Sequence, residues 1–166
     1  MEHDRKRFSN TVILPAFDTL VLSDAVKKFL QNGGVSILIG ESRSEYVARQ
    51  MSHKRQADET RQQFQDLAGK ARSYNRNGLL VAVDQEIGGI CRLEHLVPQY
   101  PDMINFSDDH YSDFELEALF ASVARAAKKM GVNCFLAPIL DLVTGTNPWL
   151  EGRTWSTDPE TVAKVS

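Results

Sequence analysis

Short apolar runs alternate with helical patterns along the chain, and this alternation constrains the fold more than any other feature of the sequence. The runs occupy residues 12–14, 35–39, 79–83 and 135–140. The second and third are nearly continuous in apolar residues, which is typical of strands buried on both faces of a parallel sheet. Pro138 lies inside the fourth run and cannot donate to a strand ladder, so we expect it to mark a strand end or a bulge.

The segments between these runs carry helix signals. Ser23 can cap a helix that ends before the Gly33-Gly34 pair. Residues 44–73 are polar with a thin apolar stripe, which predicts one or two helices on the outside of the fold. Residues 112–130 have apolar side chains at helical spacing, and a last helix is predicted to begin near residue 157, at a Thr-Asp-Pro-Glu sequence.

The order β-α-β-α-β-α-β-α predicts an α/β fold whose parallel strands are joined by right-handed helical crossovers. Two closures fit this order: an open doubly wound sheet, and about half of a TIM (β/α)8 barrel. For the half barrel we expect four adjacent strands in sequence order, with helices on one face. The chain stops in what looks like the first turns of a helix, so we expect a truncated barrel. Residues 1–10 are expected to form a charged tail, and residues 11–166 the first four β/α units.

Charge and composition argue against several classes of function. The formal net charge is -3 and the pI is about 5.8, which gives no electrostatic reason to expect nucleic acid or an anionic membrane as a partner. The charged N-terminus lacks the apolar segment of a secretory signal, and no apolar run approaches the ~20 residues of a membrane span. Cys91 and Cys134 are expected to be reduced and unpaired, which favours the cytoplasm. With no metal-ligand spacing and no dinucleotide or phosphate motif, neither a metal nor a cofactor is predicted.

Carboxylates follow three of the four predicted strands. Glu41 follows the second run, Asp84 and Glu86 follow the third, and Asp141 follows the fourth. Because functional groups gather at the carboxyl ends of parallel strands, we expect these side chains to share a polar mouth.

The loop after the third strand is the most informative segment. The pair Gly88-Gly89 lets the backbone turn sharply or approach a ligand closely. The carboxylate of Asp84 can accept hydrogen bonds from neighbouring hydroxyls of a pyranose, and the alternative is a helix cap or a turn-stabilising role. For Glu86, a ligand role and a buried pair with an arginine both remain open.

Arg153 follows the fourth run and lies between Trp149 and Trp155 in the sequence. An arginine beside aromatic residues suits a sugar site, because the apolar faces of a sugar stack on rings while its hydroxyls need fixed donors. A surface salt bridge is the alternative for Arg153, and packing in the core is the alternative for each tryptophan.

Two separated motifs resemble those of glycoside hydrolase family 3, especially its bacterial β-N-acetylhexosaminidase branch. Residues 80–86, Leu-Val-Ala-Val-Asp-Gln-Glu, resemble the third strand of that family, which continues as Gly-Gly-Arg-Val-x-Arg. Residues 131–141 and 151–159 are similar to its fourth strand and the following Arg-Ser-Phe/Tyr-x-x-Asp-Pro segment. The resemblance spans the chain from about Thr11 onward. It departs from the family where Ile87 replaces the first glycine and Gly89 replaces the first arginine.

The resemblance implies a sugar-binding subsite made by Asp84, Arg92 and Arg153, with Asp141 on the floor of the same mouth. It also places the Lys-His motif, the histidine acid/base and the aspartate nucleophile of the family beyond the residues given. A retaining glycosidase needs both a nucleophile and an acid/base. No catalytic residue is therefore assigned within this chain.

The resemblance thus implies hydrolysis of the O-glycosidic bonds of β-linked sugars by a retaining mechanism. A β-N-acetylglucosaminide is the first candidate substrate and a β-glucoside the second, and carbohydrate is the expected partner. The alternative is a non-catalytic remnant or a sugar-binding fragment, and the chain alone is expected to be inactive. Because a half barrel exposes strand edges and its inner face, we expect further chain or a partner copy to supply the missing half, or poor solubility.

Overall fold

A computed structural model of the chain describes residues 8–75, 78–86, 88–99, 112–143 and 145–165. Its centre is a parallel sheet of four strands, β1 (Ala16–Phe17), β2 (Ser36–Ile39), β3 (Leu80–Asp84) and β4 (Cys134–Leu136). The strands lie in the order β1-β2-β3-β4. This order confirms the predicted half barrel and not a doubly wound sheet, in which the strand order reverses.

The helices are α2 (Asp24–Gln31), α3 (Arg43–Ala48), α4 (His53–Asp58), α5 (Arg61–Tyr74), α6 (Asp113–Lys129) and α7 (Pro159–Val165). Ser23 caps α2 and Ser112 caps α6, each by accepting a backbone N–H bond in the first turn. The stretch predicted as one or two helices contains three, because Ser42, Ser52 and Thr60 each start a new helix.

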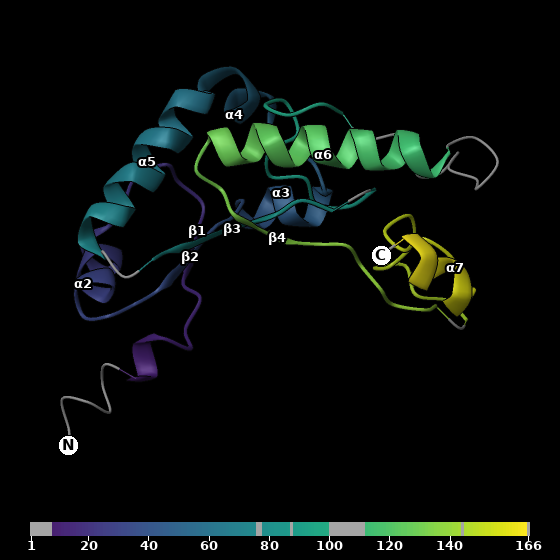
Figure 1. The fold of residues 1–166 in the computed structure, drawn as a ribbon, viewed down its shortest axis with the longest axis horizontal. Coiled ribbons are helices and arrows are strands. Elements are labelled where there is room, and N and C mark those ends of the chain that lie inside the picture. Colours follow the sequence, from purple (N-terminus) through teal and green to yellow (C-terminus); the bar gives the residue numbers. More distant parts are fainter. Residues whose placement is uncertain (1–7, 76–77, 87, 100–111, 144, 166) are drawn as a thin grey trace.

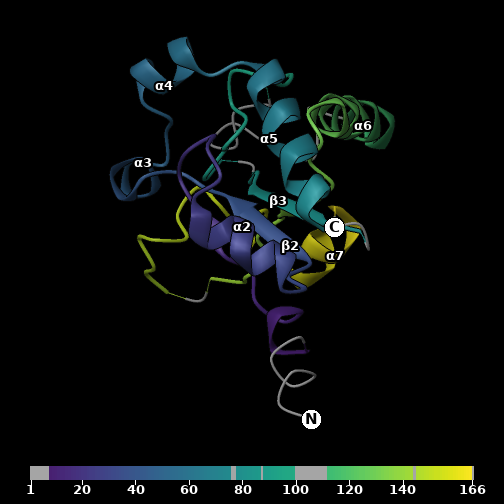
Figure 2. The same ribbon diagram turned by 90° about the vertical axis from the view of Figure 1, so that its left-hand side faces the viewer.

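Three helices, α2, α5 and α6, cover one face of the sheet (Figures 1 and 2). The core lies between them, and its buried members come from the second and third strands and from the apolar stripes of these helices: Val26, Leu30, Ile37, Ile39, Phe64, Leu67, Val81, Val83, Val123 and Ala127. Each helix thus buries one apolar stripe against the sheet and leaves its polar side in solvent. The predicted placement of helices on one face is confirmed for these three.

The first and last strands differ from their predicted positions. Residues 12–14 were expected to form the first strand, but Val12 is 74% exposed and β1 begins at Ala16. The upstream chain still runs beside β2, since Leu38 N donates to Pro15 O at 2.9 Å, but Pro15 has no N–H to continue the ladder. The fourth strand ends at Leu136, ahead of Pro138, so the prediction that Pro138 lies at a strand end is confirmed.

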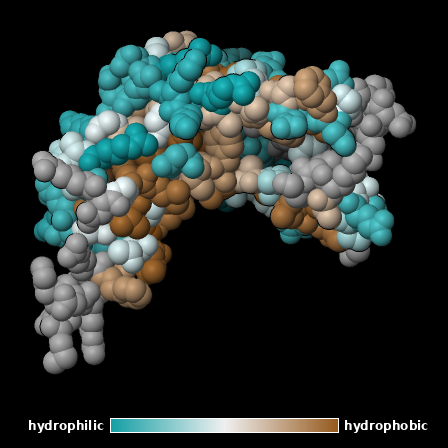
Figure 3. Space-filling model, viewed as in Figure 1, coloured by the Kyte–Doolittle hydropathy of each residue, from teal (hydrophilic) through white to brown (hydrophobic). Residues whose placement is uncertain are grey.

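The face of the sheet that turns away from the helices is open. Its side chains alternate with those of the core, so Leu80 and Leu136 point to this side and are 41% and 38% exposed. Figure 3 shows apolar surface gathered in the hollow underside of the arch formed by the sheet and its helices. In a complete barrel this face would be the packed interior.

Candidate functional site

A cavity of about 480 Å³ lies at the carboxyl ends of β1, β2 and β3. Two carboxyl side chains from neighbouring strand ends line it, Glu41 after β2 and Asp84 at the end of β3. Its lining also includes Ala16, Phe17, Asp18, Leu38, Gly40, Arg43 and Tyr46. The predicted polar mouth at this edge of the sheet therefore contains two of the acids that the sequence singled out.

Asp84 is half-buried at the edge of this cavity. Within the described part of the chain, no side chain or backbone group donates a hydrogen bond to its carboxylate. Burial raises the pKa of Asp84, the nearby Glu86 carboxylate raises it further, and Arg153 opposes both effects. Its backbone is paired, since Asp84 O accepts from Arg92 N at 2.8 Å, so only the side chain is left available to a ligand.

Glu41 has an even stronger perturbation. Burial and then the Asp84 carboxylate raise the pKa of Glu41 to about 7, and Arg92 partly opposes this. Its Oε2 is shielded from solvent and has no hydrogen-bond partner among the residues that the structure describes. At neutral pH this side chain is therefore close to half-protonated.

Glu86 and Arg153 form a buried bidentate ion pair. Arg153 Nε lies 2.7 Å from Glu86 Oε2, and Arg153 Nη2 lies 2.6 Å from Glu86 Oε1. The two side chains are 4% and 5% exposed, and the guanidinium stacks on Trp149 at 4.7 Å. Of the roles left open for Glu86, the structure shows the buried pair with an arginine. The salt bridge of Arg153 is therefore buried and not on the surface. The positive charge of Arg153 also acts to lower the pKa of Asp84.

Arg92 lies in the core and does not line the cavity. Its side chain is fully buried, with Nη1 and Nη2 donating to the two carboxylate oxygens of Glu59 at 2.7 and 3.0 Å. Its Nε donates to Gly40 O at 2.6 Å, so Arg92 fixes the backbone immediately before Glu41. Direct sugar binding by Arg92 stays a prediction, and it would require the guanidinium to leave this pair.

The Gly-rich loop folds into a tight hairpin that needs glycine at residue 89. Glu86 N donates to Ile90 O at 2.8 Å, which brings the two arms of the loop together. A Cβ at Gly89 would lie 1.9 Å from Glu86 Oε2 and 3.1 Å from Arg153 Cγ. The glycine that departs from the family motif is thus the residue that lets the loop close over the ion pair. Ile87, the other departure, lies outside the described residues.

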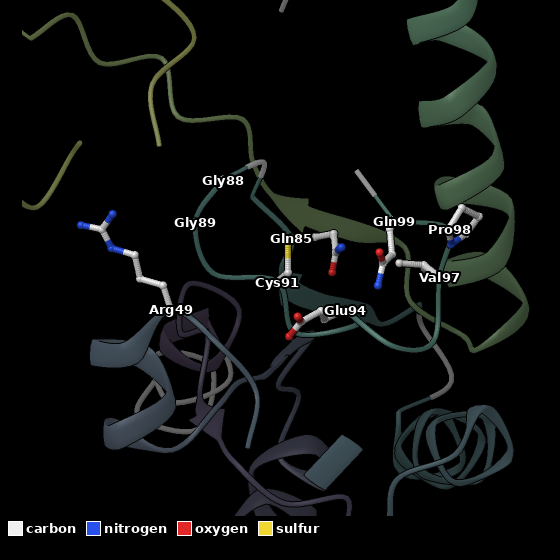
Figure 4. Close-up of a pocket in the computed structure, with 9 residues that line it drawn as sticks. All are labelled: Arg49, Gln85, Gly88, Gly89, Cys91, Glu94, Val97, Pro98 and Gln99. Atoms are coloured by element: carbon white, nitrogen blue, oxygen red, sulfur yellow. The ribbon is translucent and has the colours of Figure 1, made fainter. Parts of the chain in front are cut away.

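A second cavity, of about 320 Å³, lies on the flank of this loop and is lined by Arg49, Gln85, Gly88, Gly89, Cys91, Glu94, Val97, Pro98 and Gln99 (Figure 4). Burial raises the pKa of the Cys91 thiol to about 12, so the thiol is not a nucleophile at neutral pH. Arg49 points away from Cys91 (Figure 4), and its guanidinium donates to the carbonyls of Pro148, Trp149 and Glu151. Sequence reasoning missed Arg49, because these contacts span about a hundred residues.

The remaining predicted site residue, Asp141, is exposed and lines neither cavity described above. It follows the end of β4 at Leu136, on an extended segment beyond Pro138. Its predicted place on the floor of the mouth stays a prediction. In the described ranges of the chain, no group of three or more His, Cys, Asp and Glu side chains is arranged to hold a metal ion. None of the described helices is both long enough and apolar enough to cross a membrane.

Comparison with known proteins identifies a family that this chain matches and solved structures with a similar fold. Residues 14–166 match the Glycosyl hydrolase family 3 N terminal domain. No curated protein matches the chain. Among solved structures, the fold is similar to a glycosyl hydrolase of the GH3 family from Mycobacterium smegmatis, with a TM-score of 0.67 and 19% identity over 97% of this chain and 44% of that one.

Two further structures have the same fold. NagZ from Neisseria gonorrhoeae, in complex with N-trifluoroacetyl-D-glucosamine, has a TM-score of 0.69 and 19% identity over 92% of this chain and 44% of that one. LpqI from M. tuberculosis has a TM-score of 0.65 and 19% identity over 97% of this chain and 42% of that one. The chain thus spans less than half the length of these structures.

Proposed function

This chain belongs to glycosyl hydrolase family 3, and we propose that it supplies sugar-binding residues to a site that hydrolyses the O-glycosidic bonds of β-linked sugars. The observation that carries the proposal is the Asp84 carboxylate, which accepts no hydrogen bond from any described residue and lines a cavity at the carboxyl ends of three adjacent strands. This edge is where barrel enzymes of this kind hold their substrates. A carboxylate with free acceptor positions binds sugar hydroxyls through charge-assisted hydrogen bonds.

We propose a β-N-acetylglucosaminide as the first candidate substrate and a β-glucoside as the second. The Asp84-Gln85-Glu86 motif supports the first, since it is the form found in the β-N-acetylhexosaminidase branch that the sequence resembles. The glucosamine derivative bound to the similar NagZ structure also supports it. The proposed reaction retains configuration at the anomeric carbon, so it needs a nucleophile and an acid/base that this chain is not assigned.

The two arginines support the site from outside the cavity. Burial and the Glu86 carboxylate raise the pKa of Asp84, and Arg153 opposes both effects. Arg153 thereby limits the loss of the ionised carboxylate that a sugar hydroxyl needs as acceptor. Arg92 holds the Gly40 carbonyl and so fixes the end of β2. We propose that both position the mouth while Asp84 contacts the sugar, and direct contact of Arg92 and Arg153 with the sugar stays a prediction.

A non-catalytic sugar-binding role is the second candidate. The departures from the family motif at Ile87 and Gly89 favour it. Both free cysteines support a reducing compartment, and we propose the cytoplasm.

Asp84→Asn should weaken sugar binding by this chain. Replacing the charged acceptor removes hydrogen bonds worth about 1.5–3 kcal/mol, or roughly ten- to a hundredfold in Kd. The melting temperature should hardly change, because no described residue depends on this carboxylate for a hydrogen bond. Titration with N-acetylglucosamine by NMR, beside a thermal melt, measures both. A large loss of stability with unchanged affinity would assign Asp84 a structural role.

The 166-residue chain, purified alone, should not hydrolyse a nitrophenyl β-glycoside. The leaving oxygen must be protonated while a carboxylate attacks the anomeric carbon from the opposite side, and Asp84 and Asp141 are assigned neither role. Release of nitrophenol is followed by absorbance. Turnover abolished by Asp84→Ala or Asp141→Ala would show that a nucleophile does lie within these residues.

A further inference from the structure

Glu41 is the acid of the mouth to which the family resemblance assigns no role. It follows Gly40 at the end of β2 and lines the same cavity as Asp84. The register between β2 and β3 pairs Leu38 with Ala82. Two residues further along each strand, this register brings Gly40 level with Asp84. Glu41, the next residue, therefore lies one position further along than Asp84, on a neighbouring strand about 4.8 Å away, and both side chains line the cavity.

Three other glutamates near the mouth have cationic partners. Glu86 is paired with Arg153, Glu45 with Arg55, and Glu59 with both Arg55 and Arg92. The Oε2 atom of Glu41, by contrast, is shielded from solvent and has no hydrogen-bond partner in the ranges that the structure describes. A shielded polar atom without a partner costs free energy, and a ligand hydroxyl in the cavity would remove that cost.

We propose that Glu41 is a second sugar-binding carboxyl, which holds a hydroxyl of the same pyranose as Asp84. This inference rests on the proposed function, because it adds a specificity-determining contact to the same sugar site. Two carboxyls from neighbouring strands that line one cavity suit two hydroxyls of one ring. Tyr46 also lines the cavity and offers an aromatic side chain for the apolar face of the sugar.

The protonation of Glu41 should make the sugar affinity of this site depend on pH. Besides burial, the charged groups that act on Glu41 are Asp84, Glu45 and Glu86, which raise its pKa, and Arg92, which lowers it. Asp18 and Arg43 line the same cavity. A hydroxyl that donates to the carboxylate favours its ionised form. Sugar affinity should therefore rise as the pH increases through 7, because the ionised Glu41 is the stronger acceptor.

The experiment measures the Kd of the full chain for N-acetylglucosamine and for glucose by NMR titration at pH 5.5 and pH 8.5. Glu41→Ala should weaken binding about tenfold at pH 8.5 and less at pH 5.5. Glu41→Gln keeps the size of the side chain and should make the affinity independent of pH over this range. Glu117→Gln, on the exposed side of α6, is the matched control and should behave as the wild type.

The possible failures are distinguishable. If Asp84→Asn weakens binding while both Glu41 variants bind as the wild type at both pH values, the role of Glu41 is overturned and the proposed function stands. If the wild type binds neither sugar, or if no variant at either residue changes Kd, the proposed function is overturned as well. Circular dichroism checks that each variant is folded. If Glu41→Ala is unfolded, the role of Glu41 is judged from Glu41→Gln alone, by whether its Kd is the same at both pH values.

Discussion

At the scale of single residues, identical side chains in this chain do different work because of their partners. Glu86 and Glu41 follow neighbouring strands, but Glu86 is neutralised by Arg153, whereas the shielded oxygen of Glu41 has no hydrogen-bond partner among the described residues. The difference decides which carboxyl can receive a ligand. Gly89 makes the pairing of Glu86 possible, since only a residue without a Cβ fits against its carboxylate.

Gly89→Ala should therefore destabilise the protein. The added Cβ would overlap Glu86 Oε2, and moving that carboxylate breaks a buried bidentate pair, a loss of about 3–5 kcal/mol. Chemical denaturation measures the change. Gly69→Ala in α5 is the control, because a Cβ there meets nothing within 4 Å, and it should stabilise the helix by up to about 1 kcal/mol. Equal stabilities for the two variants would mean that the loop simply shifts.

At the scale of elements, the short helix α3 is held by one buried carboxylate. Glu45 accepts from Ser42 N at 2.9 Å in a capping box, from Ser52 N at 3.0 Å at the start of α4, and from Arg55 Nε at 2.9 Å. It is 5% exposed. Although burial acts to raise it, the hydrogen bonds from Arg55, Ser52 and Ser42 hold the pKa of Glu45 well below its usual range.

Glu45→Gln should lower the free energy of unfolding at pH 7 by about 3 kcal/mol, because it leaves Arg55 partly unpaired in a buried place. The folded-state pKa of Glu45 is depressed, so its contribution is present above the ordinary value of 4.5 and is lost as the pH falls below it. The gap between wild type and variant should narrow in acid. Denaturant titrations at pH 7 and pH 3.5 test this.

Glu115→Gln is the matched control for that experiment. Glu115 forms the same capping box with Ser112 at the start of α6, but it is exposed and has no buried arginine against it. Its removal should have a small effect at both pH values. A loss as large as that of Glu45→Gln would show that capping, and not the buried network, explains the stability.

At the scale of the whole molecule, the sheet has a covered face and an open one. Leu80 and Leu136 point to the open face of a sheet whose edge strands are β1 and β4, and Figure 3 shows apolar surface in the hollow of the arch. An apolar, concave surface with free strand edges favours association. In a parallel arrangement, β4 of one copy can pair with β1 of another, which would close an eight-stranded barrel from two halves.

We therefore expect the 166-residue chain to self-associate as its concentration rises, with Leu80→Lys and Leu136→Lys shifting it toward monomer. Both changes put a charge in the apolar hollow, where it is costly to bury. Analytical ultracentrifugation measures the distribution. Val47→Lys is the control, because Val47 is 59% exposed on the helix α3 and is not on a strand of the sheet. Identical distributions for all variants would exclude the open face as the contact.

Local interactions explain what the sequence determined by itself. The caps at Ser23 and Ser112 and the apolar periods of α2, α5 and α6 depend on neighbours three or four residues away, so they were predictable from the chain alone. The alternation of elements predicted parallel strands with right-handed crossovers, but it left two closures open, and the strand order followed only for the half barrel. The family motif likewise identified Asp84 without knowledge of its surroundings.

Tertiary structure alone decided which charged groups neutralise one another. The pair of Arg92 and Glu59 joins residues 33 positions apart, and the pair of Arg153 and Glu86 joins residues 67 positions apart. No local pattern encodes such pairings, because they depend on strand register and on which side of the sheet each loop crosses. The ends of β2 and β3 likewise bring Glu41 and Asp84 into one cavity. The sequence alone shows which acids follow the strands. Which of them are available to a ligand depends on the fold, because the fold decides which acids pair with the buried arginines.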